Sequence, residues 1–118
     1  MRYSIEGAAL TCFLANRGLR IAQADPASDD PWEGATAEER ASYIHGVDYA
    51  MGRATDAETQ HAEWFRWHLD RGWVWGPEYD EQAKVHPAMV LNWSEVPEIY
   101  RDRGRLFLRL VAWFAAAL

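Results

Sequence analysis

Hydrophobic residues recur at the spacing of an α-helix in several stretches of the chain. The first stretch covers residues 4–24, and its expected apolar face is formed by Ile5, Ala9, Cys12, Phe13 and Ile21. Proline, glycine, serine and aspartate dominate residues 23–36, which predicts a loop. Trp32 lies inside this loop. Because a large ring gains much free energy by burial, we expect Trp32 to pack back onto the domain.

Two capping-box patterns predict where the next two helices begin. Thr36 is followed three residues later by Glu39, and Thr55 is followed in the same way by Glu58. The first pattern precedes a helical stripe of Tyr43, Ile44, Val47, Ala50 and Met51. The second predicts a helix that ends at Gly72, with His61, Trp64 and His68 near one face and with Phe65 and Leu69 near the next.

The C-terminal third predicts short extended pieces and then a last helix. Residues 73–77 are rich in β-branched and aromatic side chains, and Pro87 biases His86 away from helix. Pro97 is typical of the first turn of a helix, which we expect to run from about Glu98 to the end. The pattern as a whole predicts a mainly α fold of about four helices with a short β element, in one domain over residues 1–118.

Composition and charge narrow the classes of function. The net charge is -6, which disfavours binding to a nucleic-acid polymer. The single cysteine leaves no intrachain disulfide and no thiol cluster for zinc, which suits a cytoplasmic protein. The apolar segment 106–118 is shorter than the roughly 20 residues of a membrane-spanning helix. We expect it to form a buried or interface helix, with no membrane partner.

Four of the seven tryptophans and three of the four histidines lie between residues 61 and 87. The seven-residue separation of His61 and His68 does not match the spacing of zinc ligands on one helix, so no metal site is predicted. His86, Lys84 and Asp80 could form an acid–base group, but no nucleophile elbow, phosphate loop or dinucleotide fingerprint accompanies them. We therefore predict no enzyme, no catalytic residue and no cofactor.

Binding of a flat, anionic ligand is the sharper hypothesis for this segment. Aromatic rings stack on nucleobases, and basic side chains hold phosphates. The segment offers Trp64, Trp67, Trp73 and Trp75, with Lys84 and His86 nearby, while Arg101, Arg105 and Arg109 form a basic stripe on the last helix. The alternatives stay open: the tryptophans can be core residues, and the stripe can be a solvated face.

The same segment resembles the ryanodine-receptor repeat (RyR) domain of small bacterial and phage proteins. The matching positions are His61, Glu63-Trp64, Gly72-Trp73, Trp75-Gly76, Asp80, Lys84, His86-Pro87, Val90 and Val96-Pro97. They place the repeat-like core at residues 57–114, after an N-terminal helical extension, 1–56. The weaker matches in the extension are Asn16-Arg17, Pro31-Trp32, Glu39-Arg40 and Gly46-Val47. The chain departs from the family at Trp75, usually tyrosine, and at Ala88, usually cysteine.

The resemblance implies a non-enzymatic module that binds a nucleotide or a nucleotide-derived signal, as a sensor or a sequestering protein in bacterial or phage defence. It implies that Trp64 lies in the wall of the ligand cleft and that a lone repeat forms a homodimer, for which the apolar last helix offers a surface. The expected ligand-binding residues are His61, Trp64, Trp73, Trp75, Lys84, His86 and Arg101. The alternative function is a structural or interaction module that docks a protein through its aromatic surface.

Overall fold

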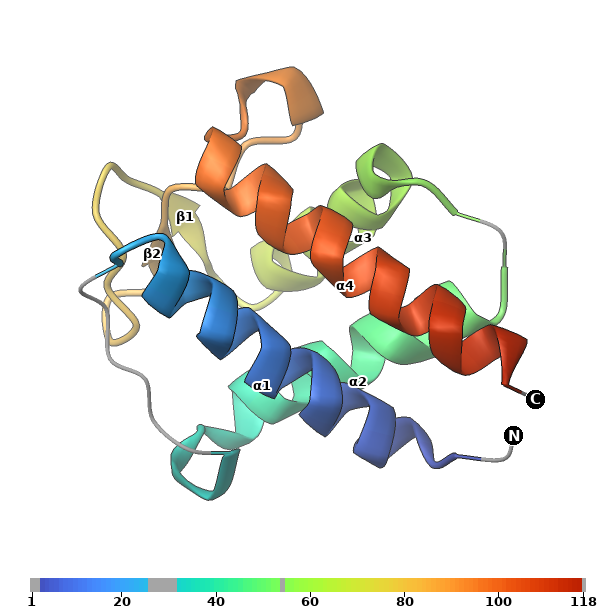
Figure 1. Ribbon diagram of the computed structural model, residues 1–118. Coiled ribbons are helices and arrows are strands. Elements are labelled where there is room, and N and C mark those ends of the chain that lie inside the picture. Colours follow the sequence, from blue (N-terminus) through green and yellow to red (C-terminus); the bar gives the residue numbers. More distant parts are fainter. Residues whose placement is uncertain (1–2, 26–31, 54, 118) are drawn as a thin grey trace.

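The computed structural model describes residues 3–25, 32–53 and 55–117 (Figure 1). Its four α-helices are α1 (Ile5–Ala22), α2 (Ala37–Met51), α3 (Ala57–Leu69) and α4 (Glu98–Ala116). The shorter elements are the 3-10 turns η1 (Trp32–Gly34) and η2 (Trp93–Glu95) and the strands β1 (Val74–Trp75) and β2 (Val85–His86). The prediction of a mainly α domain with about four helices and a short β element is confirmed. Residues 26–31 of the expected loop lie outside the described residues.

Side-chain caps fix where α2 and α3 begin. The Thr36 hydroxyl accepts a hydrogen bond from the backbone N–H of Glu39 at 3.1 Å, as the first capping box predicts. The second prediction is wrong by one residue, because Asp56 and not Thr55 caps α3. The Asp56 carboxylate accepts from the N–H of Thr59 at 2.7 Å. A carboxylate also complements the positive end of the helix dipole, which favours Asp56 over a neutral hydroxyl.

The end of α3 is reached earlier than the sequence predicts. The helix stops at Leu69 and is capped by Asp70, so Gly72 lies beyond the helix. Gly72 has a φ of +90°, a left-handed conformation that favours glycine. The N–H of Trp73 donates to the carbonyl of His68 at 3.1 Å. Gly72 therefore lets the chain turn sharply after α3 and lead directly into β1.

The main hydrophobic core lies between α1, α2 and α4. Its buried members include Ala8, Ala9, Cys12, Phe13, Trp32, Val47, Ala50, Val111 and Phe114. The Trp32 ring meets the Phe13 ring edge-on at 5.3 Å, which confirms the expected anchoring. Ile21 was expected on the buried face but is 62% exposed, because the last turn of α1 extends past the core. Figure 1 shows α1 and α4 side by side, with α2 crossing behind them.

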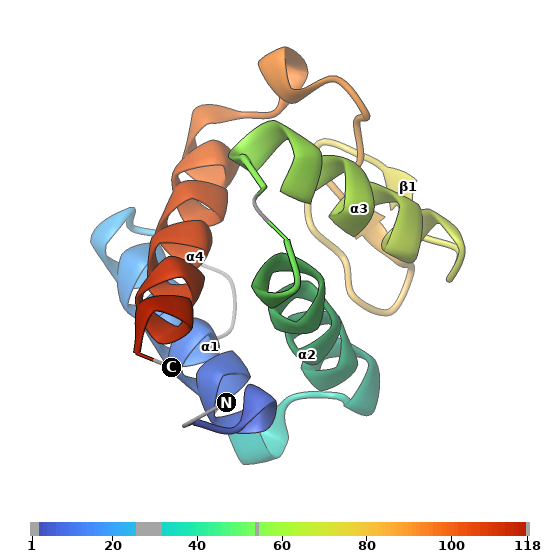
Figure 2. The same cartoon turned by 90° about the vertical axis from the view of Figure 1, so that its right-hand side faces the viewer.

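Helix α3 and the segment that follows it, up to α4, form a second layer. Figure 2 shows α3 and β1 on one side of α2, with α1 on the other. Strands β1 and β2 pair in parallel, with Val74 opposite Val85 and Trp75 opposite His86. A Cβ atom on Gly76 would lie 2.2 Å from Cγ1 of Val85. Only glycine lets the two strands approach this closely. Gly76 therefore has a structural role.

The apolar C-terminal segment belongs to α4 and takes part in the core through Val111 and Phe114. Within residues 3–25, 32–53 and 55–117, no helix combines the length and apolarity needed to cross a bilayer.

Candidate ligand-binding cavity

A cavity of about 260 Å³ lies where the second layer meets the helical core. Residues from α1, α2, α3 and α4 line it, together with residues from the segment between α3 and α4. All four histidines of the chain are in its wall: His45, His61, His68 and His86. Because these histidines come from three different elements, the fold and not the local sequence brings them together.

Hydrogen bonds to the backbone fix the tautomers of three of the histidines. The Nε2 atom of His61 lies 2.6 Å from the Val90 carbonyl, and Nδ1 of His68 lies 2.8 Å from the Trp64 carbonyl. A carbonyl only accepts, so both nitrogens carry the proton. In His86 the backbone-bonded nitrogen is instead an acceptor, because Nδ1 accepts a hydrogen bond from the N–H of Ala88 at 2.9 Å. In neutral His86 the proton therefore lies on Nε2.

Burial keeps these three imidazoles neutral near pH 7. Loss of solvation lowers the pKa of His68 to about 4 and the pKa of His86 to about 3. Burial also lowers the pKa of His61, although its hydrogen bond to the Val90 carbonyl opposes the shift. The remaining nitrogen is therefore an acceptor in His61 and His68 and a donor in His86. The His68 acceptor lies 3.5 Å from the Ser42 hydroxyl.

Trp64 is half-buried in the cavity wall and packs against three of these imidazoles. Its ring is stacked on His61, with centroids 5.5 Å apart and planes 22° apart. The centroids of His68 and His86 lie 4.2 and 5.1 Å from it. The expected helical face of His61, Trp64 and His68 is confirmed by these contacts. Trp64 therefore both supports the wall and lines the cavity.

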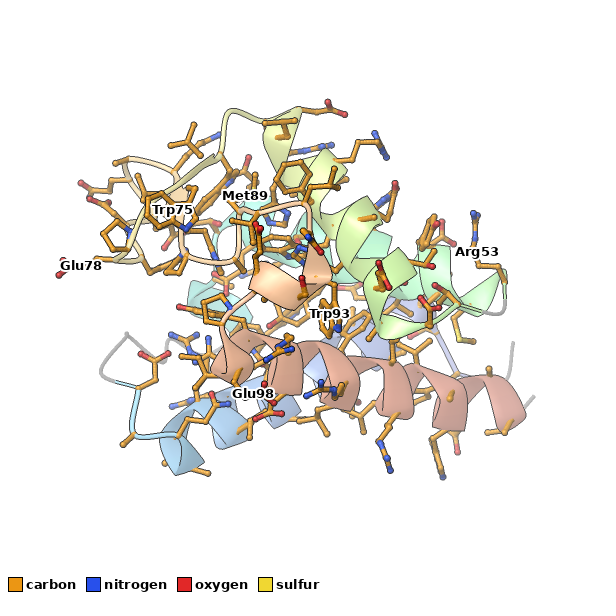
Figure 3. The ribbon with its side chains drawn as sticks, turned by 90° about the horizontal axis from the view of Figure 1, so that it is seen from above. Arg53, Trp75, Glu78, Met89, Trp93 and Glu98 are labelled. Carbon is orange, nitrogen blue, oxygen red and sulfur yellow. The ribbon has the colours of Figure 1, made fainter. Side chains whose placement is uncertain are left out.

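Trp73 is buried and stacks on Tyr79, with ring centroids 6.0 Å apart. Its indole N–H donates to a carboxylate oxygen of Glu38 at 3.4 Å. Trp67 and Trp93 also line the cavity. In Figure 3 the Trp93 side chain points from η2 toward α4, where its ring would be 3.4 Å from a Cβ placed on Gly104. Aromatic rings thus form much of the wall.

Two amides in the wall leave an oxygen without a partner. The Gln60 side chain is 8% exposed, and its Nε2 donates to the Gly46 carbonyl at 3.0 Å. Its Oε1 is buried and has no hydrogen-bond partner among the described residues. Asn16 bonds the Tyr43 hydroxyl through Nδ2 at 2.9 Å, and its Oδ1 is likewise unpartnered within the described part of the chain. A buried acceptor left in this way costs about 1–3 kcal/mol.

The lone cysteine also lines the cavity. Burial raises the pKa of the Cys12 thiol to about 12, so it stays protonated and is a poor nucleophile. Within the described ranges, no three histidine, cysteine, aspartate or glutamate side chains are grouped so as to hold a metal ion.

Four of the seven expected ligand-binding residues line this cavity: His61, Trp64, Trp73 and His86. The other three lie elsewhere. Trp75 is 58% exposed and lies at the edge of the molecule (Figure 3). The Lys84 ammonium contacts a Glu38 carboxylate oxygen at 3.1 Å and the Arg71 carbonyl at 2.8 Å. Arg101 pairs with Glu98 on its own helix.

The rest of the arginine stripe also faces away from the cavity. Arg105 contacts carboxylates of Glu98 and Asp102, each at 3.1 Å, and Arg109 is exposed. The cationic side chains in the wall are instead Arg20 and Arg103. These two arginines, His45 and Gln60 are not among the ligand-binding residues expected from the sequence. For His68 a signal was present, because it shares the helical face of His61 and Trp64.

Comparison of the chain with protein-family models, curated proteins and solved structures gave no match. The resemblance to the RyR repeat therefore stays a prediction, and the function is argued from the cavity itself.

Proposed function

We propose that the protein binds a nucleotide or a nucleotide-derived molecule in this cavity, and that it does so without chemical turnover. The observation that carries the proposal is the cavity wall, in which the half-buried Trp64 ring lies among polar side chains, two of which have an oxygen without a partner among the described residues. A flat heteroaromatic ring matches both features, because its face stacks on an indole and its edge forms hydrogen bonds.

Turnover is left out of the proposal because the thiol and the most deeply buried imidazoles of the wall are weak catalysts. The Cys12 thiol is protonated near neutral pH, and the imidazoles of His68 and His86 have pKa values of about 4 and 3. A general base works best with a pKa near the operating pH. Binding, in contrast, gains from fixed neutral donors and acceptors in a partly dry site.

The RyR resemblance supports a setting in bacterial or phage signalling, where the protein senses or sequesters its ligand. The single reduced cysteine is in keeping with a cytoplasmic location, which forms part of the proposal. One stacked base contributes roughly 1–3 kcal/mol. Micromolar affinity needs about -8 kcal/mol, so the hydrogen-bonding groups of the wall must add to the stacking.

Calorimetric titration tests this proposal with nucleosides, nucleotides and cyclic nucleotides as probes. We expect saturable binding of at least one of them, and no product by chromatography after prolonged incubation. Trp64→Ala should weaken that binding roughly tenfold or more through the lost stacking. Trp75→Ala is the matched control, because Trp75 does not line the cavity. Trp64→Leu, which keeps an apolar wall, serves if the alanine variant is unfolded by circular dichroism.

Three outcomes would overturn the proposal. If none of the probes binds at millimolar concentration, the cavity is not a nucleotide site. If Trp75→Ala weakens binding as much as Trp64→Ala does, the ligand lies on the exposed surface instead. If product forms during the incubation, the protein is an enzyme and the proposal of binding without turnover is wrong.

A second candidate function is docking of a protein partner through the aromatic surface. It is favoured by the exposure of both residues of β1, since Val74 and Trp75 are more than half exposed, and by the nearby exposed Tyr79. Exposed apolar residues of this size are enriched in protein interfaces. In this case Trp75→Ala would abolish partner binding and Trp64→Ala would not.

We also propose that the protein forms a homodimer through α4. Trp113, near the end of this helix, is 58% exposed although its ring packs on Tyr3 and Phe114. Light scattering should give about twice the chain mass of 13.6 kDa. A monomer mass for the unmodified protein at high concentration would contradict this proposal, and Trp113→Glu should convert a dimer to that mass.

A further inference from the structure

The charged side chains in the cavity wall are unbalanced. Five carboxylates line the cavity: Asp25, Glu38, Glu39, Glu63 and Glu81. Arg20 and Arg103 are the lining guanidinium groups among the described residues. Two of these carboxylates have cationic partners outside the lining, since Lys84 pairs with Glu38 and Arg66 pairs with Glu63. The formal charge of the lining side chains together with these two partners is -1. With the histidines His61, His68 and His86 neutral, the wall keeps a small net negative charge toward an entering ligand.

The two arginines face a shared carboxylate. Arg103 donates to Asp25 at 2.6 Å and, through Nε, to the Gln23 side-chain carbonyl at 3.0 Å. Its guanidinium carbon also lies 4.6 Å from the Tyr100 ring centroid. The Nε atom of Arg20 lies 3.5 Å from the same Asp25 carboxylate. Much of the positive charge in the wall is therefore offset before any ligand enters.

Among the polar atoms of Gln60, His61, His68 and His86 that are not bonded to the backbone, acceptors outnumber donors. Gln60 Oε1 is an acceptor buried in the wall, since its amide nitrogen donates to the Gly46 carbonyl. The unprotonated nitrogens of His61 and His68 add two more, and the His68 nitrogen lies 3.5 Å from the Ser42 hydroxyl. His86 Nε2 is a donor, with no hydrogen-bond partner in residues 3–25, 32–53 and 55–117. A ligand that complements this wall brings N–H donors and one acceptor.

We propose that the cavity selects an uncharged nitrogen heterocycle with N–H donors on its edge, such as the base end of a nucleoside, and keeps phosphate groups outside. This inference rests on the proposed function and specifies which part of the ligand enters. Phosphate carries about -1.5 to -2 charges near pH 7 and offers only acceptors. Both properties oppose the wall. The volume of about 260 Å³ is also below the roughly 300–1,000 Å³ of pockets that enclose a drug-sized molecule.

The test compares each of four nucleosides (adenosine, guanosine, cytidine and uridine) with its own 5′-monophosphate by calorimetry. For the base that binds, we expect the monophosphate to bind roughly tenfold more weakly at low salt, because its charge meets the negative wall. The gap should narrow as salt screens the repulsion, while nucleoside affinity stays nearly constant.

A charge variant sharpens the comparison. Glu81 lines the cavity, is exposed and is far from the main core, so Glu81→Gln should leave the fold intact. We expect it to raise monophosphate affinity roughly twofold relative to nucleoside affinity, because it removes one negative charge from the wall. Glu6→Gln is the matched control, since Glu6 is exposed in the first turn of α1 and does not line the cavity. It should change neither affinity.

The possible failures are distinguishable. If a monophosphate binds more tightly than its nucleoside and salt weakens it, Arg20 and Arg103 hold the phosphate. The selectivity is then overturned while nucleotide binding stands. If Glu81→Gln and Glu6→Gln act alike, the field of the wall is not the cause of the selectivity. If no nucleoside and no monophosphate binds at millimolar concentration, the proposed function fails and the selectivity fails with it.

Discussion

Mild acidification should destabilise the fold, because His68 and His86 are buried as neutral imidazoles. In the unfolded chain a histidine takes up a proton with a pKa near 6.5. In the folded protein burial lowers the pKa to about 4 for His68 and about 3 for His86. The unfolded state therefore binds more protons throughout this interval. The contribution of the two neutral, buried histidines to the free energy of unfolding is fully present above pH 6.5. It is lost as the pH falls from 6.5 toward the folded-state pKa values of about 4 for His68 and about 3 for His86.

The size of this loss follows from the two pKa values. One pKa unit corresponds to about 1.4 kcal/mol, so each of the two histidines should cost about 2 kcal/mol between pH 7 and pH 5. Together the loss is about 4 kcal/mol, a large part of the roughly 5–15 kcal/mol that holds a domain of this kind together. Around His68, the charge of Arg71 adds to the lowering of the pKa and the charge of Glu38 opposes it. His61 should add a further loss in the same direction.

Urea unfolding followed by far-UV circular dichroism measures this loss at pH 7, 6 and 5. The hydrogen bond from Arg66 lowers the pKa of Glu63 below its ordinary value of 4.5. The contribution of Glu63 to stability is therefore lost only below about pH 4.5, outside the range from pH 7 to pH 5. His68→Asn keeps a donor for the Trp64 carbonyl but removes the titration, and should remove about half of the pH dependence. A free energy of unfolding that stays constant from pH 7 to pH 5 would refute the burial of neutral imidazoles.

Two further changes test the local structure around the cavity. Gly76→Ala should destabilise the protein by about 1–3 kcal/mol in urea unfolding, because its Cβ would meet Val85 at 2.2 Å. Adding Val85→Ala removes the clashing methyl group, so a double-mutant cycle should show recovery, and additive losses would contradict the clash. Asp56→Ala should lower the thermal midpoint more than Thr55→Ala does, since Asp56 is the observed cap. Equal effects of the two variants would contradict the role of Asp56 as the cap, and a larger effect of Thr55→Ala would indicate Thr55 instead.

The helices were predictable because their signals are local. The Thr36 cap, the stripe through Val47 and the start of α4 after Pro97 each depend on residues within a few positions of one another. The errors have the same origin. Thr55 and Asp56 are both good caps, and only the path of the chain decides between them. The end of α3 was predicted late because Gly72 supports a reversal beyond the helix and is not its last residue.

The cavity was only partly predictable, because its wall depends on how the helices are rotated about their axes. On α4 the sequence shows a stripe of Arg101, Arg105 and Arg109, but the apolar positions of that helix are too widespread to show which face turns inward. Packing against α1 turns Arg103 to the cavity instead, where it reaches Asp25. His45 joins the wall from α2 through contacts that have no signature in its neighbouring sequence.

Buried polar atoms in the cavity wall lower the stability of the fold when they have no partner. The Gln60 oxygen alone costs about 1–3 kcal/mol when it has no partner. A ligand that fills the cavity binds only the folded state and therefore stabilises it. At a concentration 100 times Kd, it should raise the free energy of unfolding by about 2.7 kcal/mol. Thermal shift in the presence of each nucleoside measures this gain independently of calorimetry. A nucleoside that binds by calorimetry but leaves the midpoint unchanged would have to bind the unfolded chain equally well, which excludes the cavity as its site.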